Sequence, residues 1–199
     1  MNLIFATNNT HKLKEIRSLV SDNITILSLR DAGINTEIPE DFETLEENAN
    51  QKSRFIYDIT GTNCFADDTG LEVDSLNGEP GVYSARYSRM GDLQFPDMEV
   101  SKGNIHKLLL KLRNITERKA RFRTVISLIL DKQEFVFEGV AEGTILRTPR
   151  GEEGFGYDPV FQPEGSSLSF AEMSLLEKNR LSHRGKAVEK LVDFLNQLE

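Results

Sequence analysis

The stretch LIFATNNTHKLKEIRSLV, residues 3–20, decides the class of fold. Its first four residues, Leu3 to Ala6, form a short apolar run bounded by polar residues, which predicts a buried β-strand. The segment Thr7 to Thr10 is rich in helix-capping residues, and apolar residues then recur at helical spacing from Leu13 to Val20. The chain therefore opens with a strand, a tight loop and a helix, as an α/β protein does.

The rest of the chain continues this mixture of strands and helices. Thr44 and Glu47 form a capping-box pattern at the start of a helix, and the polar turn Asp131-Lys132-Gln133 separates two β-rich runs that predict a long hairpin. These patterns predict an α/β fold with a mixed sheet, and residues 1–199 show no repeat or linker that would divide them into separate domains. The expected strands lie at 24–28, 63–66, 71–76, 120–130 and 134–146, and the expected helices start at 44, near 97 and at 182.

Composition argues against several classes of function. The net charge of −8 disfavours a nucleic-acid-binding protein, because an acidic surface gains nothing from counterion release, although a few local cations can still hold a nucleotide. Cys64 is the single cysteine, which rules out an internal disulfide framework and a multi-cysteine metal site. No apolar stretch reaches membrane-spanning length and the first residues lack a signal-peptide pattern. We therefore expect a soluble, cytoplasmic protein without nucleic-acid or membrane partners.

The first candidate site is the pattern Thr7-x-Asn9-x-x-Lys12 at the joint between the first strand and the first helix. A helix N-terminus presents free N–H groups and the positive end of the helix dipole, which together suit an anion. Lys12 adds a mobile positive charge one turn into the helix. A capped helix with a surface lysine explains the same pattern, and the glycine spacing of a P-loop is missing.

Asp67 and Asp68, in the run FADDTGL, are the second candidate. Adjacent acids at the end of an apolar strand repel each other and resist burial, and strand ends are where α/β proteins usually build their sites. Carboxylates at such a place suit Mg²⁺ together with substrate phosphates, or can deprotonate a water molecule. A solvated strand end with a turn at Gly70 is the alternative. Six further acids lie between Glu37 and Glu47, and one of them could reach a metal ion.

Two segments in the last third of the chain have the composition of a nucleoside-binding site. The segment GFGYDP, residues 154–159, alternates glycines, which allow close backbone approach, with aromatic rings that can stack on a base. Lys178, His183 and Arg184 gather basic and imidazole groups around a helix start, where Ser182 is the expected N-cap. A tight turn with buried aromatic residues explains the first segment equally well.

Together these motifs resemble the inosine triphosphate pyrophosphatase family, most closely its bacterial branch. The resemblance implies a two-lobed α/β fold with an elongated mixed β-sheet flanked by helices, an active-site cleft between the lobes, and a homodimer. It also implies hydrolysis of ITP, dITP and XTP to the nucleoside monophosphate and pyrophosphate. The matching segments, in family order, are TNNTHK at 7–12, FADDTGL at 65–71, LNGEPGVYSARY at 76–87, GFGYDP at 154–159 and SHRG at 182–185.

The same resemblance assigns roles to individual residues. Asp68 matches the family's general base and metal ligand, and Glu40 matches its metal-binding glutamate, so the implied cofactor is Mg²⁺, with Mn²⁺ also suited to oxygen ligands. His11, whose surroundings alone suggest no role, enters through its place in the first matching segment. The implied substrate-binding set is Thr7, Asn8, Asn9, Thr10, His11, Lys12, Lys52, Thr69, Phe155, Gly156, Tyr157, Asp158, Lys178, His183 and Arg184.

These assignments predict a mechanism and a base preference. Charge on the triphosphate is stabilised by the metal ion and the lysines, and Asp68 activates a water molecule for attack on the α-phosphorus. Donors of His183 and Arg184 aimed at position 6 of the base would favour a 6-oxopurine over adenine. Two alternatives stay open: a pyrophosphatase of the related Maf class, acting on pyrimidine or modified nucleotides, and a nucleotide-sensing protein with a vestigial site.

Overall fold

The computed structural model describes residues 1–20 and 23–198, and the chain divides into two compact units. Unit 1 consists of Met1–Asp68, Thr124–Gly139 and His183–Glu199, whereas unit 2 consists of Thr69–Arg123 and Val140–Ser182. The chain first passes from unit 1 to unit 2 between Asp68 and Thr69 of the FADDTGL motif.

The strands form a mixed sheet flanked by helices, as predicted. The strands are β1 (Asn2–Phe5), β2 (Thr25–Leu27), β3 (Cys64–Val73), β4 (Pro80–Gly81), β5 (Lys119–Leu130), β6 (Gln133–Ile145) and β7 (Phe161–Pro163). Their order is β2-β1-β3-β5-β6-β7, with β4 beside β3. β1 pairs in parallel with β2 and β3, whereas β4 is antiparallel to β3 and β7 is antiparallel to β6. The predicted hairpin is confirmed, because only Asp131 and Lys132 separate β5 from its neighbour β6.

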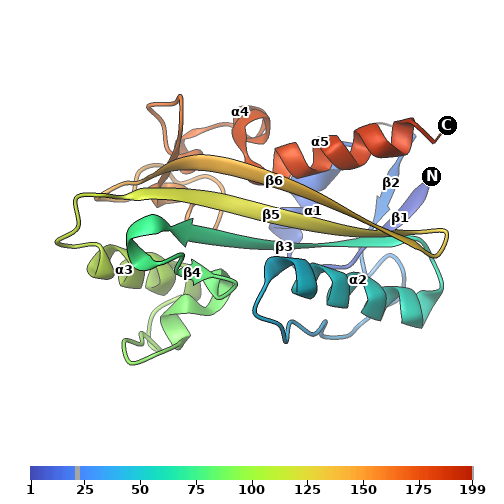
Figure 1. Cartoon of the computed structure of the whole chain (residues 1–199), viewed down its shortest axis with the longest axis horizontal. Coiled ribbons are helices and arrows are strands. Elements are labelled where there is room, and N and C mark those ends of the chain that lie inside the picture. The colour runs from blue at the N-terminus through green and yellow to red at the C-terminus, as the bar shows by residue number, and fades with distance from the viewer. Residues whose placement is uncertain (21–22, 199) are drawn as a thin grey trace. The chain divides into compact units, whose positions relative to one another are not determined.

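Three α-helices belong to unit 1, and Figure 1 shows α2 and α5 on opposite faces of the strands. Thr44 caps α2 as its sequence predicts, because its side chain accepts a hydrogen bond from the N–H of Glu47. Gly61, with φ of 61°, ends the same helix in the left-handed conformation that glycine adopts without strain. The helices are α1 (Thr10–Arg17), α2 (Leu45–Thr60) and α5 (His183–Asn196).

Alternation of side chains along β1 and β3 gives unit 1 two apolar layers, one on each face of these strands. Phe5 and Phe65 stack with their ring centroids 4.6 Å apart, in the layer that α1 and α5 cover. Ile4, Cys64 and Ala66 point the other way, into the layer that α2 covers. The same alternation decides where the next residues of β3 point.

Unit 2 has its own apolar core, in which aromatic rings pack together. The ring centroid of Phe161 lies 4.7 Å from that of Phe122 and 5.2 Å from that of Phe170. Helix α3 (Val100–Lys111) packs against the 3-10 helix Ser84–Arg89. The remaining helices of this unit are α4 (Leu175–Leu181) and short 3-10 helices at Asp74–Leu76, Asp158–Val160 and Phe170–Glu172. Within the described residues, no helix combines the length and the apolar character that crossing a membrane requires.

One predicted break in a strand is wrong, and one helix was not predicted. β3 is a single strand of 10 residues, so there is no turn at Gly70 and no separate strand at 71–76. A Cβ at Gly70 would lie 2.8 Å from the carbonyl oxygen of Gly81, so the glycine permits the close approach of β4 instead. The structure also has α4, which the prediction lacked although Ser174 and Glu177 form a capping box at its start.

Candidate active site

Asp67 and Asp68 lie in the middle of β3 with only 1% and 7% of their surfaces exposed. The prediction that these adjacent acids resist burial is therefore wrong, and the reason is that each carboxylate is paired with a buried cation, Arg184 for Asp67 and Lys52 for Asp68. Alternation along the strand turns Asp67 to the face of Phe65 and Asp68 to the face of Ala66. The two carboxylates consequently belong to two different ion-pair clusters.

Lys52 of α2 joins Asp68 to Glu40. Its Nζ donates to Oδ1 of Asp68 at 2.9 Å and to Oε1 of Glu40 at 2.6 Å. Asn48, one turn earlier on α2, donates to Oδ2 of Asp68 at 3.4 Å. Burial raises the pKa of the Asp68 carboxyl, against the opposing effect of the Lys52 charge. Burial lowers the pKa of Lys52, but the charges of Asp68 and Glu40 outweigh it, so the lysine stays a cation.

Asp67 belongs to the second cluster, with Lys12 and Arg184. Nζ of Lys12 donates to Oδ1 of Asp67 at 2.8 Å, and Nε of Arg184 donates to Oδ2 at 3.3 Å. Arg184 also pairs with Glu15 of α1, and 1% of its surface is exposed. Burial opposes the charge on Asp67, but Lys12 and Arg184 hold the pKa of this carboxyl well below its usual range. Burial, above all, lowers the pKa of Lys12.

The predicted anion site at the start of α1 is partly occupied by the chain's own groups. Asn9 is the N-cap, and its Oδ1 accepts from the N–H groups of His11 at 3.0 Å and Lys12 at 3.2 Å. Oγ1 of Thr7 accepts from the N–H of Asn9 at 3.1 Å. These bonds fix the segment 7–12 in a turn that directs Lys12 inward to Asp67. Of the other members of the segment, Asn8, Thr10 and His11 are exposed.

The predicted nucleoside-binding residues of unit 2 form a cluster around the buried Asp158. Its Oδ2 accepts from Nζ of Lys178 at 2.6 Å and from the N–H of Phe155 at 2.8 Å. The same Nζ lies 4.9 Å from the centroid of the Phe155 ring, within cation–π distance. Gly154 has φ of 75°, and a Cβ there would lie 2.2 Å from Oδ2 of Asp158. Glycine is therefore required at this position.

Tyr157 and Phe155 differ in their surroundings, although both are aromatic residues of this segment. Tyr157 is 4% exposed, belongs to the core of unit 2, and donates from its hydroxyl to the carbonyl oxygen of Ser84 at 3.0 Å. Phe155 is only half-buried, and Gly156 between them has φ of 60°. Of the two rings, Phe155 is the one better placed to stack on a base.

The remaining predicted residues are divided between the units. His183 is the first residue of α5 and is buried beside Arg184 in unit 1, whereas Thr69 is half-buried on β3 and begins unit 2. Unit 1 thus brings together Glu40, Lys52 and Asp68, and separately Lys12, Asp67 and Arg184. Unit 2 brings together Phe155, Asp158 and Lys178.

Two residues of these clusters, Glu15 and Asn48, were not predicted. Both lie on the inward faces of their helices: Glu15 is 5% exposed beside Ile16, and Asn48 is 1% exposed beside Ala49. A polar side chain within the apolar stripe of a helix is the signal that could have found them, because such a group is costly to bury without a partner.

The oxygen donors of Glu40 and Asp68 fit a magnesium ion. Both carboxylates contact the single ammonium group of Lys52, so they lie close enough to approach one cation. Within residues 1–20 and 23–198, no group of three or more His, Cys, Asp or Glu side chains is placed to hold a metal ion. Mg²⁺ does not need such a cage, because it is usually held by one or two carboxylates together with substrate phosphates and water.

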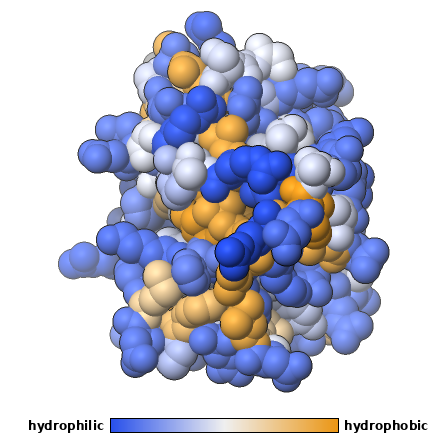
Figure 2. All heavy atoms as spheres, turned by 90° about the vertical axis from the view of Figure 1, so that its left-hand side faces the viewer, coloured by the Kyte–Doolittle hydropathy of each residue, from blue (hydrophilic) through white to orange (hydrophobic). Residues whose placement is uncertain are grey.

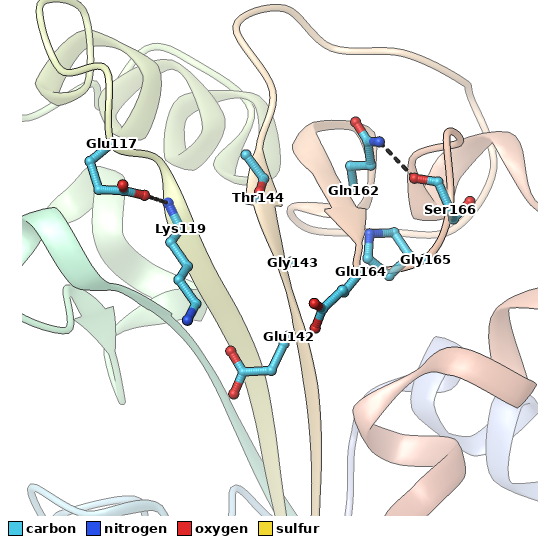
Figure 3. Close-up of a pocket in the computed structure, with 10 residues that line it drawn as sticks. Glu117, Lys119, Glu142, Gly143, Thr144, Gln162, Glu164, Gly165 and Ser166 are labelled. Atoms are coloured by element: carbon cyan, nitrogen blue, oxygen red, sulfur yellow. Dashed lines mark hydrogen bonds between the residues drawn. The ribbon is translucent and has the colours of Figure 1, made fainter.

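A cavity of about 470 Å³ lies elsewhere, on β5, β6, β7 and the turn after β7 of unit 2 (Figure 3). Lys119, Glu142 and Glu164 are among its lining residues, and Figure 3 shows their side chains directed toward this space. As far as the described residues go, its lining contains none of the predicted site residues. The cavity lining has three glutamates and one lysine, whereas the clusters of unit 1 place three cations, Lys12, Lys52 and Arg184, beside their carboxylates. The larger share of positive charge makes these clusters the better fit for a triphosphate.

Comparisons with known proteins identify the family of this chain. A family model described as the Ham1 family matches residues 3–194. The dITP/XTP pyrophosphatases of Flavobacterium johnsoniae and Porphyromonas gingivalis are 49% and 51% identical to this chain, over 98% and 97% of its length and 98% and 96% of theirs. Among solved structures, the Ham1 protein of Staphylococcus aureus has a TM-score of 0.85 at 35% identity and full coverage of both chains. A HAM1 protein from Coxiella burnetii has a TM-score of 0.87 at 34% identity and 99% coverage of both.

Proposed function

Because this chain belongs to the Ham1 family, we propose that it hydrolyses non-canonical purine nucleoside triphosphates, namely ITP, dITP and XTP, to the nucleoside monophosphate and pyrophosphate. The observation that carries the proposal is a pair of lysines, the half-buried Lys12 and the buried Lys52, held by the adjacent carboxylates of β3. Phosphoryl transfer depends mainly on positioning and on positive charge around the phosphates, which these lysines supply. The activity in the names of the two similar pyrophosphatases supports the same reaction.

Within unit 1, each charged residue has a distinct task. Lys12 and Lys52 stabilise the negative charge that develops on the phosphate oxygens. Asp68 accepts the proton of a water molecule whose oxygen bonds to the α-phosphorus, while the bond from that phosphorus to the bridging oxygen breaks and pyrophosphate leaves. Asp67, held by Lys12 and Arg184, keeps Lys12 in place rather than exchanging protons.

The proposal includes Mg²⁺ as the cofactor, with Glu40 and Asp68 as the residues that would hold it. When bound, the ion supplies positive charge to the triphosphate oxygens. Lys52 contacts both carboxylates and so keeps them near each other. Mn²⁺ suits the same oxygen donors.

Base choice is proposed to rest on Lys178 and Asp158, which place a donor and an acceptor 2.6 Å apart. Hypoxanthine and xanthine carry an oxo acceptor at position 6 beside an N1–H donor, whereas adenine carries a 6-amino donor beside an acceptor nitrogen. The pair therefore complements a 6-oxopurine and opposes adenine, and unpaired buried polar groups cost about 1–3 kcal/mol each. Guanine shares the 6-oxo edge, so its exclusion would depend on the 2-amino group.

Arg184 was expected to read the base, and His183 with it. The donors of Arg184 instead engage Glu15 and Asp67 within unit 1. We therefore assign the larger share of base selection to Lys178 and Asp158. A substrate role for Arg184 and His183 stays a prediction.

We also propose that the protein is a homodimer and acts in the cytoplasm. Figure 2 shows one face of the molecule on which apolar side chains reach the surface among hydrophilic ones, as an interface between two copies would require. Exposed apolar side chains of unit 2 include Leu93, Val100, Leu110, Leu168 and Leu176. Sedimentation equilibrium of the purified protein measures the oligomeric state directly.

A panel of nucleoside triphosphates tests the proposed function. Initial rates on ITP, dITP, XTP, GTP, ATP and the pyrimidine triphosphates should give the first three a kcat/KM at least tenfold above that for ATP, because several polar pairings reverse in adenine. Lys178→Met should lower the ratio of kcat/KM for ITP to kcat/KM for ATP. The control is Lys186→Met, which changes an exposed lysine of α5 and should leave this ratio unchanged. Equal rates on ATP and ITP, or a preference for pyrimidine triphosphates, would contradict the proposal.

A further inference from the structure

Ser84 lies where three segments of unit 2 meet, and the motif that contains it has no part in the proposed reaction. Its Oγ accepts from the N–H of Leu71 on β3 at 2.8 Å and donates to the carbonyl oxygen of Gly81 at 2.6 Å. Its own carbonyl oxygen accepts from the hydroxyl of Tyr157 at 3.0 Å. Ser84 therefore links Tyr157, in the segment that carries the base-binding residues, to Leu71 in the part of β3 that belongs to unit 2.

Asn104 of α3 holds Ser84 in this position. Its Nδ2 donates to the carbonyl oxygen of Ser84 at 3.1 Å, and its Oδ1 accepts from the N–H of Ser88 at 2.7 Å. Only 3% of Asn104 and 8% of Ser84 are exposed. Buried polar groups that are satisfied on several sides fix one arrangement, because any displacement breaks more than one bond.

We propose that Ser84 is a positioning residue for base binding, acting through Tyr157. The hydroxyl of Tyr157 donates to the carbonyl oxygen of Ser84. In the same segment, the N–H of Phe155 donates to the carboxylate of Asp158. Holding Tyr157 therefore holds the segment that places the Phe155 ring and the Asp158 carboxylate. The inference rests on the proposed function, in which these two groups contact the base.

Two variants remove the link from opposite ends. Ser84→Ala removes the Oγ that ties this residue to β3, and Tyr157→Phe removes only the hydroxyl that reaches the carbonyl oxygen of Ser84. Each should raise KM for ITP about fivefold with kcat nearly unchanged, the factor that corresponds to the loss of roughly one buried hydrogen bond. The double variant should raise KM no further than the single variant with the larger effect, because both changes disturb one connection.

Ser88→Ala is the matched control. Ser88 is fully buried on the same 3-10 helix, but its Oγ makes no hydrogen bond within the described residues, so its removal should leave KM unchanged. Unfolding midpoints are measured for every variant, because a purely structural loss lowers the midpoint without changing KM of the molecules that stay folded. If Ser84→Ala does not fold, the KM of Tyr157→Phe alone decides.

Calorimetric titration with ITP in the presence of a chelator separates this inference from the proposed reaction. Dissociation constants that rise about fivefold in both variants, and not in Ser88→Ala, support the positioning role even if the wild-type protein turns over no nucleotide. Wild-type affinity in both variants, or fully additive effects in the double variant, would overturn it even if ITP is hydrolysed.

Discussion

Asp67 and Asp68 follow one another on β3, and their carboxylates bind different cations. Oδ1 of Asp67 accepts from Lys12 at 2.8 Å, whereas Oδ1 of Asp68 accepts from Lys52 at 2.9 Å. Alternation along the strand explains the difference, because one side chain faces the layer under α1 and α5 and the other faces α2. Matched variants of the two acids should therefore separate catalysis from stability.

Asp68→Asn keeps the size of the side chain and removes its charge and basicity. Turnover of ITP at saturating Mg²⁺ should fall at least about 100-fold, the scale of losing a general base. The variant should stay folded, because Lys52 retains Glu40 as a partner. Steady-state rates together with circular dichroism check this prediction, and a variant that keeps a rate near that of the wild type would refute the role of Asp68.

Asp67→Asn should mainly affect stability. The change leaves the half-buried Lys12 and the buried Arg184 without the carboxylate that both contact. Breaking a buried ion pair, here that of Arg184 with Asp67, from one side costs about 3–5 kcal/mol. Urea unfolding should therefore give a larger loss of unfolding free energy for Asp67→Asn than for Asp68→Asn. Equal stability of the two variants would show that the two clusters are not distinct.

Removal of divalent metal ions should abolish turnover. Protein treated with a chelator should regain activity on adding Mg²⁺ or Mn²⁺, since both suit carboxylate and phosphate oxygens. Glu40→Gln should raise the Mg²⁺ concentration for half-maximal rate at least about tenfold, since even the loss of a group that only supports a metal ligand costs that much affinity. Glu37→Gln, an exposed acid of the same segment, is the control and should change nothing. Turnover that survives chelation would show that the reaction does not require a divalent metal ion.

The thiol of Cys64 should make stability depend on alkaline pH. Burial, with a smaller effect of the Asp58 charge, raises its pKa to about 12 in the folded protein. Because the thiol pKa of an unfolded chain is about 8.5, the folded state keeps its proton longer, and the stability that this provides is complete below about pH 8.5 and is lost as pH rises toward 12. At pH 10 the loss should be about 2 kcal/mol.

Cys64→Ala isolates this effect from the other groups that titrate in the same range. The unfolding free energy of the wild type should decline relative to that of Cys64→Ala between pH 8 and pH 10.5. Parallel profiles for the two proteins would show that the thiol ionises as freely in the folded state as in the unfolded one.

Local sequence patterns predicted most of the elements in this fold. The run Leu3 to Ala6 became β1, and the Thr44 capping pattern marked the start of α2, because both depend on residues close in sequence. The expected strand end at Asp67-Asp68 was wrong for the opposite reason. Burial of those acids depends on Lys12, Lys52 and Arg184, which come from three separate helices, and no local pattern reports such partners.

In the candidate site, too, local motifs could be predicted from the sequence, whereas contacts between distant residues could not. Motifs in the sequence identified Lys12, Asp68 and Lys178, but the partner of each became visible only in the folded chain. Arg184 illustrates the limit, because a donor-only side chain suits either a base or a carboxylate. Its pairing with Glu15 depends on the packing of α5 against α1.

Hydrolysis of ITP in H₂¹⁸O decides whether the chain is a nucleoside triphosphate pyrophosphatase, because the products and the position of the label identify both the scissile bond and the atom attacked. We expect IMP and pyrophosphate, with the ¹⁸O in the phosphate group of IMP, since water attacks the α-phosphorus. IDP with orthophosphate as the main products, or ¹⁸O in the pyrophosphate, would contradict it.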